Sequence, residues 1–452
     1  MRAGLLAARM IAAAAAIPST SVTAAQLSDI QHVIVIYLEN QSFDKLFGFF
    51  PGADGLAVAG STKVQVDKTG RPYEFLPRPI DTMHKPPRID PRFPDNLPNQ
   101  PFSIEAYVPI GQKTGDLIHR FYEQQAQING GRMDKFVAYS DAAGLAMGFY
   151  DGSHTRLWEY ARRYTLADHF FHAAFGGSFL NHFWFVCACS PRYDNAPPAI
   201  VAKLDANGNL IEGSPDVVTP DGYAVNTIQP LQGPHSSSIT DKSRLLPPQD
   251  MPTIGDRLSE KGISWAWYSG GWDDAIAGRP DKLFQFHHQA FAYFRKYSDG
   301  MEERTKHLKD AKDFIKAIGE GDLPQVAFYK PIGSLNEHPG YADVLEGDEH
   351  VGQILAAIEK SPIWSNTVVI VTFDENGGAW DHVSPPKTDR WGPGIRVPTV
   401  VVSPFAKKGF IDHTTYDTTS ILKLIETRFG LAPLSERDAK VNDLTSALEL
   451  TR

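Results

Sequence analysis

The sequence predicts an α/β fold in which helices cover both faces of a mostly parallel sheet. Apolar β-type runs alternate along the chain with amphipathic helical stretches, and this order is typical of parallel strands joined by helical crossovers. The 452 residues, with 42% hydrophobic residues, 37 Gly and 33 Pro, suit one large, loop-rich domain. We therefore expect a single domain over residues 26–452, with insertions.

The individual elements follow from apolar periodicity and from capping residues. The expected strands are residues 32–38, 263–268, 325–329, 367–373 and 397–402. The expected helices are residues 253–261, 303–318, 348–359 and 418–429. Thr253 is the expected N-cap of the first helix, Gly262 lies just past its end, and Thr418 or Thr419 caps the last.

Two long stretches interrupt this alternation. Residues 56–104 are rich in Pro and contain a hairpin-like turn at 68–70, and residues 191–250 carry turn signals at 207–208 and 221–222. Loops of this length inside a compact domain are usually functional lids or small subdomains. We expect both insertions to roof the mouth of an active site.

The N-terminus has the pattern of a secretory signal peptide over residues 1–25. Arg2 and Arg9 flank a short apolar stretch, an alanine-rich run follows, and small residues precede the expected cleavage after Ala24 or Ala25. The alternative is an apolar N-terminal helix of the fold. No other stretch approaches the length of a membrane span, so we expect a periplasmic or secreted protein without a transmembrane segment.

Charge and cysteine content exclude several kinds of site. The net charge is -9 and there is no Lys/Arg-rich run, so nucleic-acid binding has little support and a small-molecule partner is expected. Cys187 and Cys189 are too close to join distant parts of the chain and too few for a tetrahedral zinc site. We interpret them as small buried residues, with an unusual local pair as the alternative.

Polar residues follow two of the expected strands. Glu39 and Asn40 come after strand 32–38, and Asp374 and Glu375 come after strand 367–373. The carboxyl ends of parallel strands share one edge of a sheet, so the two clusters can meet and offer oxygen ligands to a divalent cation. Each cluster alone is equally well explained as a turn.

A serine and several histidines could supply further chemistry. Ser178 follows Gly176-Gly177, which allow a tight turn, and a metal ion could activate its hydroxyl as a nucleophile; a helix-capping turn is the alternative. Imidazoles in polar or aromatic loops could contact a phosphate or donate a proton, although each could equally be an ordinary hydrogen-bonding histidine. These candidates are His119, His287, His288, His338 and His382.

Several segments together resemble the signature segments of the bacterial phosphoesterase family. They are residues 38–44, 176–178 with Asn181-His182, 337–339, 372–383, 412–414 and 420–422. The family contains phosphatidylcholine-type phospholipases C and respiratory-burst-inhibiting acid phosphatases. The Phe286-His287-His288 segment and the Gly-Gly-Ser loop are more similar to the acid phosphatase branch.

The resemblance implies an alkaline phosphatase-like fold and one metal ion, divalent or iron. By motif, the metal ligands are Glu39, Asn40, Ser178, Asp374 and Glu375, and Ser178 is also the nucleophile. The expected phosphate-binding or substrate-binding residues are His119, His287, Asn181 and His382, and the expected general acid is His288 or His338. Gln41 stands where the family motif more often has Arg, so any role of that arginine is absent or supplied elsewhere.

The resulting expectation is an exported, metal-dependent acid phosphatase that hydrolyses phosphate monoesters through a phosphoserine. Two alternatives stay open. One is a phosphodiesterase of the phospholipase C type, and the other is a non-catalytic phosphate- or metal-binding protein. If protonated histidines hold the phosphate, activity should favour acidic pH. The identity of the metal and the oligomeric state do not follow from the sequence.

Overall fold

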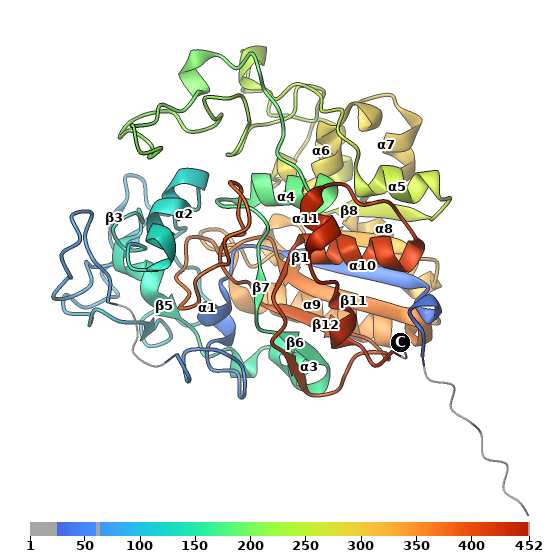
Figure 1. Cartoon of the computed structure of the whole chain (residues 1–452), viewed down its shortest axis with the longest axis horizontal. Coiled ribbons are helices and arrows are strands. Elements are labelled where there is room, and N and C mark those ends of the chain that lie inside the picture. The colour runs from blue at the N-terminus through green and yellow to red at the C-terminus, as the bar shows by residue number, and fades with distance from the viewer. Residues whose placement is uncertain (1–24, 60–63, 451–452) are drawn as a thin grey trace, which may run out of the picture.

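A computed structural model describes residues 25–59 and 64–450, and its centre is one eight-stranded sheet. The strand order is β13-β6-β12-β11-β1-β10-β8-β9. Helices α3, α8 and α9 pack together on one face of the sheet, and α4, α5, α10 and α11 pack together on the other (Figure 1). The predicted α/β fold is confirmed.

The strands at the centre of this sheet are its most buried elements. Among them, β1 is exposed only at His32, and all of β11 is buried. Only β12 runs against the others, since it pairs antiparallel with both β11 and β6. The strands are β1 (His32–Leu38), β6 (Thr165–Ala167), β8 (Trp265–Ser269), β9 (Leu308–Asp310), β10 (Val326–Lys330), β11 (Thr367–Phe373), β12 (Thr399–Val402) and β13 (Phe410–Asp412).

Several helices begin at a polar residue whose side chain caps the first turn. As predicted, Thr253 caps α5, and its side chain forms a reciprocal capping box with Asp256. The helices are α1 (Phe43–Phe47), α2 (Phe121–Ile128), α3 (Arg156–Arg163), α4 (Ser178–Cys187), α5 (Ile254–Glu260), α6 (Trp272–Ile276), α7 (Glu302–His307), α8 (Ala311–Glu320), α9 (Val344–Lys360), α10 (Thr419–Phe429) and α11 (Glu436–Lys440).

The single helix expected over residues 303–318 is wrong. The chain leaves the helical conformation after His307, pairs as β9 with β8, and enters α8 only after Asp310. Asp310 closes a capping box with Asp313, so a cap lies where the apolar periodicity predicted a helix interior. The edge position next to β8 outweighs the local helix propensity.

Two other helix boundaries also differ from expectation. Helix α9 begins at Val344 rather than at residue 348, because the Asp343 side chain accepts a hydrogen bond from the Glu346 amide. At α10, Thr418 is the N-cap, but its side chain makes no capping bond. The Asp417 carboxylate caps the helix instead, by accepting from the Thr419 amide at 2.7 Å.

Short strands tie the insertions and loops together. Within residues 56–104, β2 (Ile80–Asp81) and β3 (Arg88–Ile89) form a hairpin. At the end of the same stretch, β4 (Phe102–Ser103) pairs with β5 (Gly148–Phe149), and elsewhere β7 (Phe170–Phe171) pairs with β14 (Tyr416–Asp417).

The insertion at residues 191–250 contains both predicted turns. Leu204 bridges to Leu210 around the turn at 207–208, and Val218 bridges to Ala224 around the turn at 221–222. In Figure 1 this green segment lies beyond α4 and α6 at one end of the molecule.

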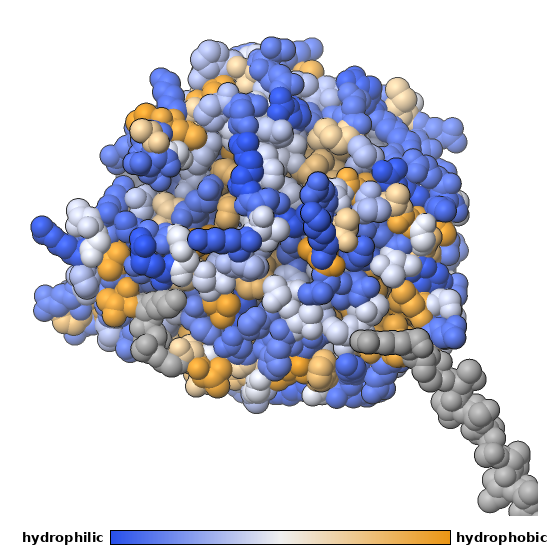
Figure 2. Space-filling view, in the orientation of Figure 1, coloured by the Kyte–Doolittle hydropathy of each residue, from blue (hydrophilic) through white to orange (hydrophobic). Residues whose placement is uncertain are grey.

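The expected signal peptide falls almost entirely outside the described residues. Among the described helices, none combines the length and the apolar character that a membrane span requires. Figure 2 shows the surface on one face of the molecule, where apolar residues are scattered among polar ones.

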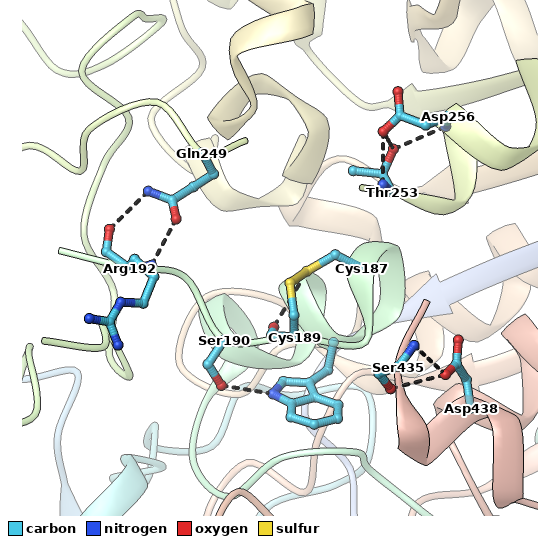
Figure 3. Close-up of a disulfide and its surroundings, with 10 residues drawn as sticks. Cys187, Cys189, Ser190, Arg192, Gln249, Thr253, Asp256, Ser435 and Asp438 are labelled. Atoms are coloured by element: carbon cyan, nitrogen blue, oxygen red, sulfur yellow. Dashed lines mark hydrogen bonds between the residues drawn. A yellow bond between two sulfur atoms is a disulfide. The ribbon is translucent and has the colours of Figure 1, made fainter. Parts of the chain in front are cut away.

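Cys187 and Cys189 form a disulfide at the C-terminal end of α4 (Figure 3), so our preference for two unpaired buried residues is wrong. Ala188 between them ends α4 in the left-handed conformation, at φ 46°. This turn brings the two Cα atoms to 5.1 Å, which lies within disulfide range. The bond closes a local loop and joins no distant segments.

Candidate active site

The two acidic clusters meet at the carboxyl edge of the sheet. Strands β1 and β11 are parallel neighbours with Leu38 opposite Phe373, so the residues that follow them emerge side by side. Glu39, Asn40, Asp374 and Glu375 are all 0% exposed. The Asn40 amide donates to Asp374 Oδ1 at 3.3 Å, which links one cluster directly to the other.

Ser178 lies at the point where these clusters converge. Its Oγ donates toward Glu39 Oε2 at 3.1 Å, Asn40 Oδ1 at 3.3 Å and Glu375 Oε1 at 3.3 Å. The preceding Gly176 has φ +88°, and a Cβ there would approach the Phe121 amide nitrogen to 2.5 Å. Only glycine adopts this positive φ easily and leaves room for the Phe121 backbone. The glycine therefore allows the tight turn that places Ser178 against the carboxylates.

The oxygen cluster fits a divalent cation. Asp374 Oδ2 is buried without a hydrogen-bond partner among the described residues. Burial raises the pKa of Asp374 well above its usual value, and neighbouring Glu39 raises it further. Burial likewise raises the pKa of Glu375 to about 7. Buried carboxylates this close repel each other unless a positive charge lies among them. Three carboxylates, an amide oxygen and a hydroxyl make a ligand set for a hard or borderline metal ion.

Nitrogen ligands lie close to the same cluster. Glu39, His182 and His288 each offer a ligand atom within 4.8 Å of the others, and so do Asp116, His119 and His338. Several groups of residues at this edge could therefore hold a metal ion.

Lys330 is a part of the site that the sequence analysis missed. It ends β10, the other neighbour of β1, and its Nζ forms a fully buried ion pair with Glu39 Oε1. His288 Nε2 contacts the same oxygen at 2.9 Å. Burial alone would raise the pKa of Glu39, but Lys330 and His288 hold it well below its usual value. The sequence offered one signal for this residue: Lys330 directly follows the apolar strand expected over residues 325–329, as Glu39 and Asp374 follow theirs.

Replacing Lys330 with Met is expected to destabilise the protein by about 3–5 kcal/mol, because it leaves a buried carboxylate without its cation. Activity should fall as well, since the Glu39 carboxylate loses the contact that fixes it. Urea unfolding and kcat/KM measure the two effects. The matched control is Lys312→Met, which removes an ion pair from a side chain that is 67% exposed and should change little. Equal stability of both variants would contradict this account.

A cavity of about 430 Å³ opens beside Ser178. Four of the histidines named as candidates from the sequence, His119, His287, His288 and His338, line it. His119 Nε2 lies 3.7 Å from Glu375 Oε1, and His338 Nε2 lies 3.9 Å from Glu39 Oε2, so the imidazoles border the oxygen cluster. Further lining residues not anticipated from the sequence are Asp116, Arg120, Asp141, Asn226, Gln285 and Tyr341.

Of the two insertions, only the one at residues 191–250 contributes residues of its described part to the lining of this cavity. Val225, Asn226 and Thr227 of the 191–250 insertion form part of its wall, whereas the described part of 56–104 contributes no lining residue. The latter insertion instead supports a lining residue from outside, because Thr82 Oγ1 donates to the Asp116 carbonyl oxygen at 2.7 Å.

The cavity histidines differ in protonation. Burial lowers the pKa of His287 and His338, and lowers that of His288 to about 4. Burial also disfavours the His119 imidazolium, but the carboxylates of Glu375 and Asp116 outweigh this effect and raise its pKa to about 9. The raised pKa favours the cationic form of His119, whereas the lowered pKa values favour the neutral forms of His287, His288 and His338, so phosphate binding by protonated forms of these three would require acidic pH.

Two predicted phosphate ligands lie outside the cavity lining. The Asn181 side chain accepts from the Ala174 amide at 2.9 Å and donates to the Gly177 carbonyl at 3.1 Å, so it shapes the serine loop. His382 contacts Asp44 at 2.7 Å and Asp54 at 3.2 Å in a separate cluster around Arg396. Both residues have structural positions, and we do not carry their predicted phosphate contacts further.

A buried histidine behind the serine loop makes the fold sensitive to acid. His172 Nδ1 lies 2.8 Å from the Ala174 carbonyl, and burial lowers its pKa from 6.5 to about 4. Between these values the unfolded chain binds a proton that the folded protein does not bind. The free energy of unfolding should therefore fall as pH decreases from about 6.5 to about 4. Urea unfolding at several pH values should show a flatter dependence for His172→Gln, while His154→Gln, at an exposed position, should keep the wild-type slope.

Comparison with known proteins agrees with this geometry. The profile of the Phosphoesterase family matches residues 30–432, which include all the residues of the oxygen cluster. The chain belongs to the phosphoesterase family. The family membership predicted from the motifs is thereby confirmed, and the protein is a phosphoric ester hydrolase.

Curated relatives of this phosphoesterase are phospholipases C. Phospholipase C B of Mycobacterium tuberculosis is 26% identical over 93% of this chain and 78% of its own length. The non-hemolytic phospholipase C of Pseudomonas aeruginosa is 24% identical over 93% of this chain and 57% of its own length. Non-specific phospholipase C6 of Arabidopsis thaliana is 28% identical over 45% of this chain and 42% of its own length.

The solved structures that match this chain do so at lower sequence identity. An alkaline phosphatase superfamily protein from Vibrio parahaemolyticus has a TM-score of 0.34 and 10% identity, over 75% of this chain and 73% of its own. The lipoteichoic acid synthase LtaP of Listeria monocytogenes has a TM-score of 0.38 and 9% identity, over 91% of this chain and 76% of its own.

Proposed function

We propose that this phosphoesterase hydrolyses phosphodiesters of the phospholipid-headgroup type, with Ser178 as the nucleophile. The relatives that match 93% of the chain are named phospholipases C, which favours this alternative over the monoester phosphatase that the motifs first indicated. The observation that carries the choice of nucleophile is the contact of Ser178 Oγ with the buried oxygen cluster at the floor of the cavity.

The charge around the cavity supports a diester. A phosphate monoester carries close to two negative charges at neutral pH, whereas a diester carries one. Among the described lining residues Arg120 is the only Lys or Arg, and its guanidinium is already paired with Asp216. Asp116 and Asp141 add carboxyl groups to the same wall. This environment suits a singly charged phosphate attached to a cationic headgroup better than a dianion.

The proposed reaction has two displacements. Ser178 reacts in its ionised form: its Oγ forms a bond to phosphorus while the bond from phosphorus to the diacylglycerol oxygen breaks. The raised pKa of His119 favours its protonated form, so we assign His119, in place of the His288 or His338 expected from the motifs, as donor of the proton that this leaving oxygen needs. Water then attacks phosphorus, gives one proton to His119 and keeps the other on the phosphoryl oxygen. The bond from phosphorus to Ser178 Oγ breaks, which restores the ionised serine and releases the phosphorylated headgroup. A divalent cation held by Glu39, Asn40, Asp374 and Glu375 would stabilise negative charge on the serine and phosphoryl oxygens.

Three substrates separate the candidate functions. We expect kcat/KM for p-nitrophenylphosphorylcholine to exceed that for p-nitrophenyl phosphate by about tenfold or more, since discrimination by a pocket of this kind is worth 1–3 kcal/mol. Phosphatidylcholine in detergent micelles should release phosphocholine. Preferential turnover of the monoester would favour the acid phosphatase instead. Turnover of none of the three by metal-loaded protein would favour a non-catalytic binding protein.

We further propose that the protein is exported as one domain after removal of residues 1–25. The signal-like N-terminus supports this location, and so does the disulfide, because such bonds persist in oxidising compartments. N-terminal sequencing of the protein recovered from the periplasm or medium tests the proposal. An intact Met1 would contradict it.

A further inference from the structure

The hairpin formed by β2 and β3 carries an exposed tip of mixed apolar and cationic character. All residues from Met83 to Ile89 are exposed, and they read Met-His-Lys-Pro-Pro-Arg-Ile. Met83 is 37% exposed and Ile89 is 53% exposed. His84, Lys85 and Arg88 lie between them, on a chain whose net charge is -9. The tip thus combines two exposed apolar side chains with two cationic ones.

The base of the hairpin is firmly attached. Ile80 pairs with Ile89 and Asp81 pairs with Arg88 across the two strands. Asp90, which directly follows Ile89, is paired with Arg92, and the Asp81 carboxylate accepts from the Met83 amide at 3.0 Å and the His84 amide at 3.3 Å. It is thus engaged by the turn itself. The tip is a defined protrusion rather than a flexible loop.

The same hairpin contacts the wall of the cavity. Besides the bond from Thr82 Oγ1 to the Asp116 carbonyl, a Cβ on Gly115 would lie only 3.1 Å from the Ile80 carbonyl oxygen, so the two backbones are in close contact. Asp116 lines the cavity. In Figure 1, β3 lies at the outer edge of the molecule, beyond α2. The tip therefore projects from the surface next to the residues that border the catalytic cavity.

We propose that this hairpin docks on the surface of a phospholipid bilayer and brings the cavity to its lipid substrate. Met83 and Ile89 supply apolar side chains for the interfacial layer, and Lys85 and Arg88 match the phosphate groups there. Pro86 and Pro87 have no amide hydrogen to leave unpaired in that layer. The inference rests on the proposed function, since a substrate embedded in a membrane is what requires such a contact.

Vesicle binding tests the hairpin without requiring turnover. Full-length Ser178→Ala protein is sedimented with vesicles of phosphatidylcholine containing about one-third phosphatidylglycerol. We expect the added substitutions Met83→Ser with Ile89→Ser, or Lys85→Glu with Arg88→Glu, to weaken binding by about tenfold or more. The control pair Ile315→Ser with Lys316→Glu, exposed on α8, should bind as the parent does. Thermal melting checks that each variant is folded.

Kinetics on enzyme with an intact Ser178 separate this inference from the proposed function. The hairpin variants should keep wild-type kcat/KM for soluble p-nitrophenylphosphorylcholine and lose about tenfold in hydrolysis of vesicle lipid. Normal hydrolysis of vesicles by these variants would overturn the inference and leave the function standing. Hairpin-dependent vesicle binding by a protein that hydrolyses no diester would support the inference while the function fails. A dimer that depends on the hairpin, without vesicle binding, would assign the tip to contact between copies and overturn the proposal.

Discussion

Replacing Ser178 with Ala is expected to lower kcat/KM for a phosphodiester by about a thousandfold or more, because the reaction loses its nucleophile. The side chain is small, and its removal leaves the buried carboxylates in place. The melting temperature and the metal content should therefore stay close to those of the wild type. Steady-state kinetics, thermal melting and elemental analysis of the same preparation measure the three quantities.

Ser190→Ala is the matched control for this variant. Ser190 also lies close to α4, where its hydroxyl accepts a hydrogen bond from Trp184 Nε1 at 3.1 Å, but it is absent from the cavity lining (Figure 3). We expect this variant to lose stability of about 1 kcal/mol and to keep its activity. Comparable activity of Ser178→Ala and wild type would remove Ser178 from the mechanism.

Removal of the bound metal is the second large effect. Dialysis against a chelator is expected to lower activity at least about a hundredfold and to lower the melting temperature, because the buried carboxylates then repel one another. Adding back one divalent cation at a time should restore both properties, and the most effective ion identifies the metal. Asp374→Asn removes one of the charged ligands and should weaken metal binding about tenfold to a hundredfold. Full activity in chelated protein that elemental analysis shows to be metal-free would contradict the metal site.

Much of the fold could be predicted from the sequence because its central strands are continuous apolar runs. Strands β1 and β11 have the predicted bounds, since buried parallel strands are apolar on both faces and polar residues end them abruptly. Strand β9 was missed because three residues at a sheet edge leave no periodic signal. The disulfide was missed because Ala188 adopts a left-handed conformation that nothing in its residue type announces.

The site shows the same division. Glu39 and Asp374 converge because β1 and β11 are parallel neighbours in the sheet, so the residues that follow the two strands emerge at the same edge. Lys330 was missed because the order of β10 in the sheet, and hence its contact with Glu39, depends on packing over the whole domain. Motif resemblance placed His382 near the phosphate, whereas Asp44 and Asp54 hold it elsewhere.

The most direct test of the central claim is to trap the covalent intermediate. Metal-loaded wild-type protein is mixed with excess p-nitrophenylphosphorylcholine and quenched in acid within one turnover. The protein is then digested, and the masses of its peptides are measured by mass spectrometry. We expect one phosphocholine group on the peptide that contains Ser178, and fragmentation should assign it to that serine. Ser178→Ala protein should give no adduct. Rapid diester hydrolysis with an adduct on another residue, or with none at any quench time, would contradict the proposed mechanism.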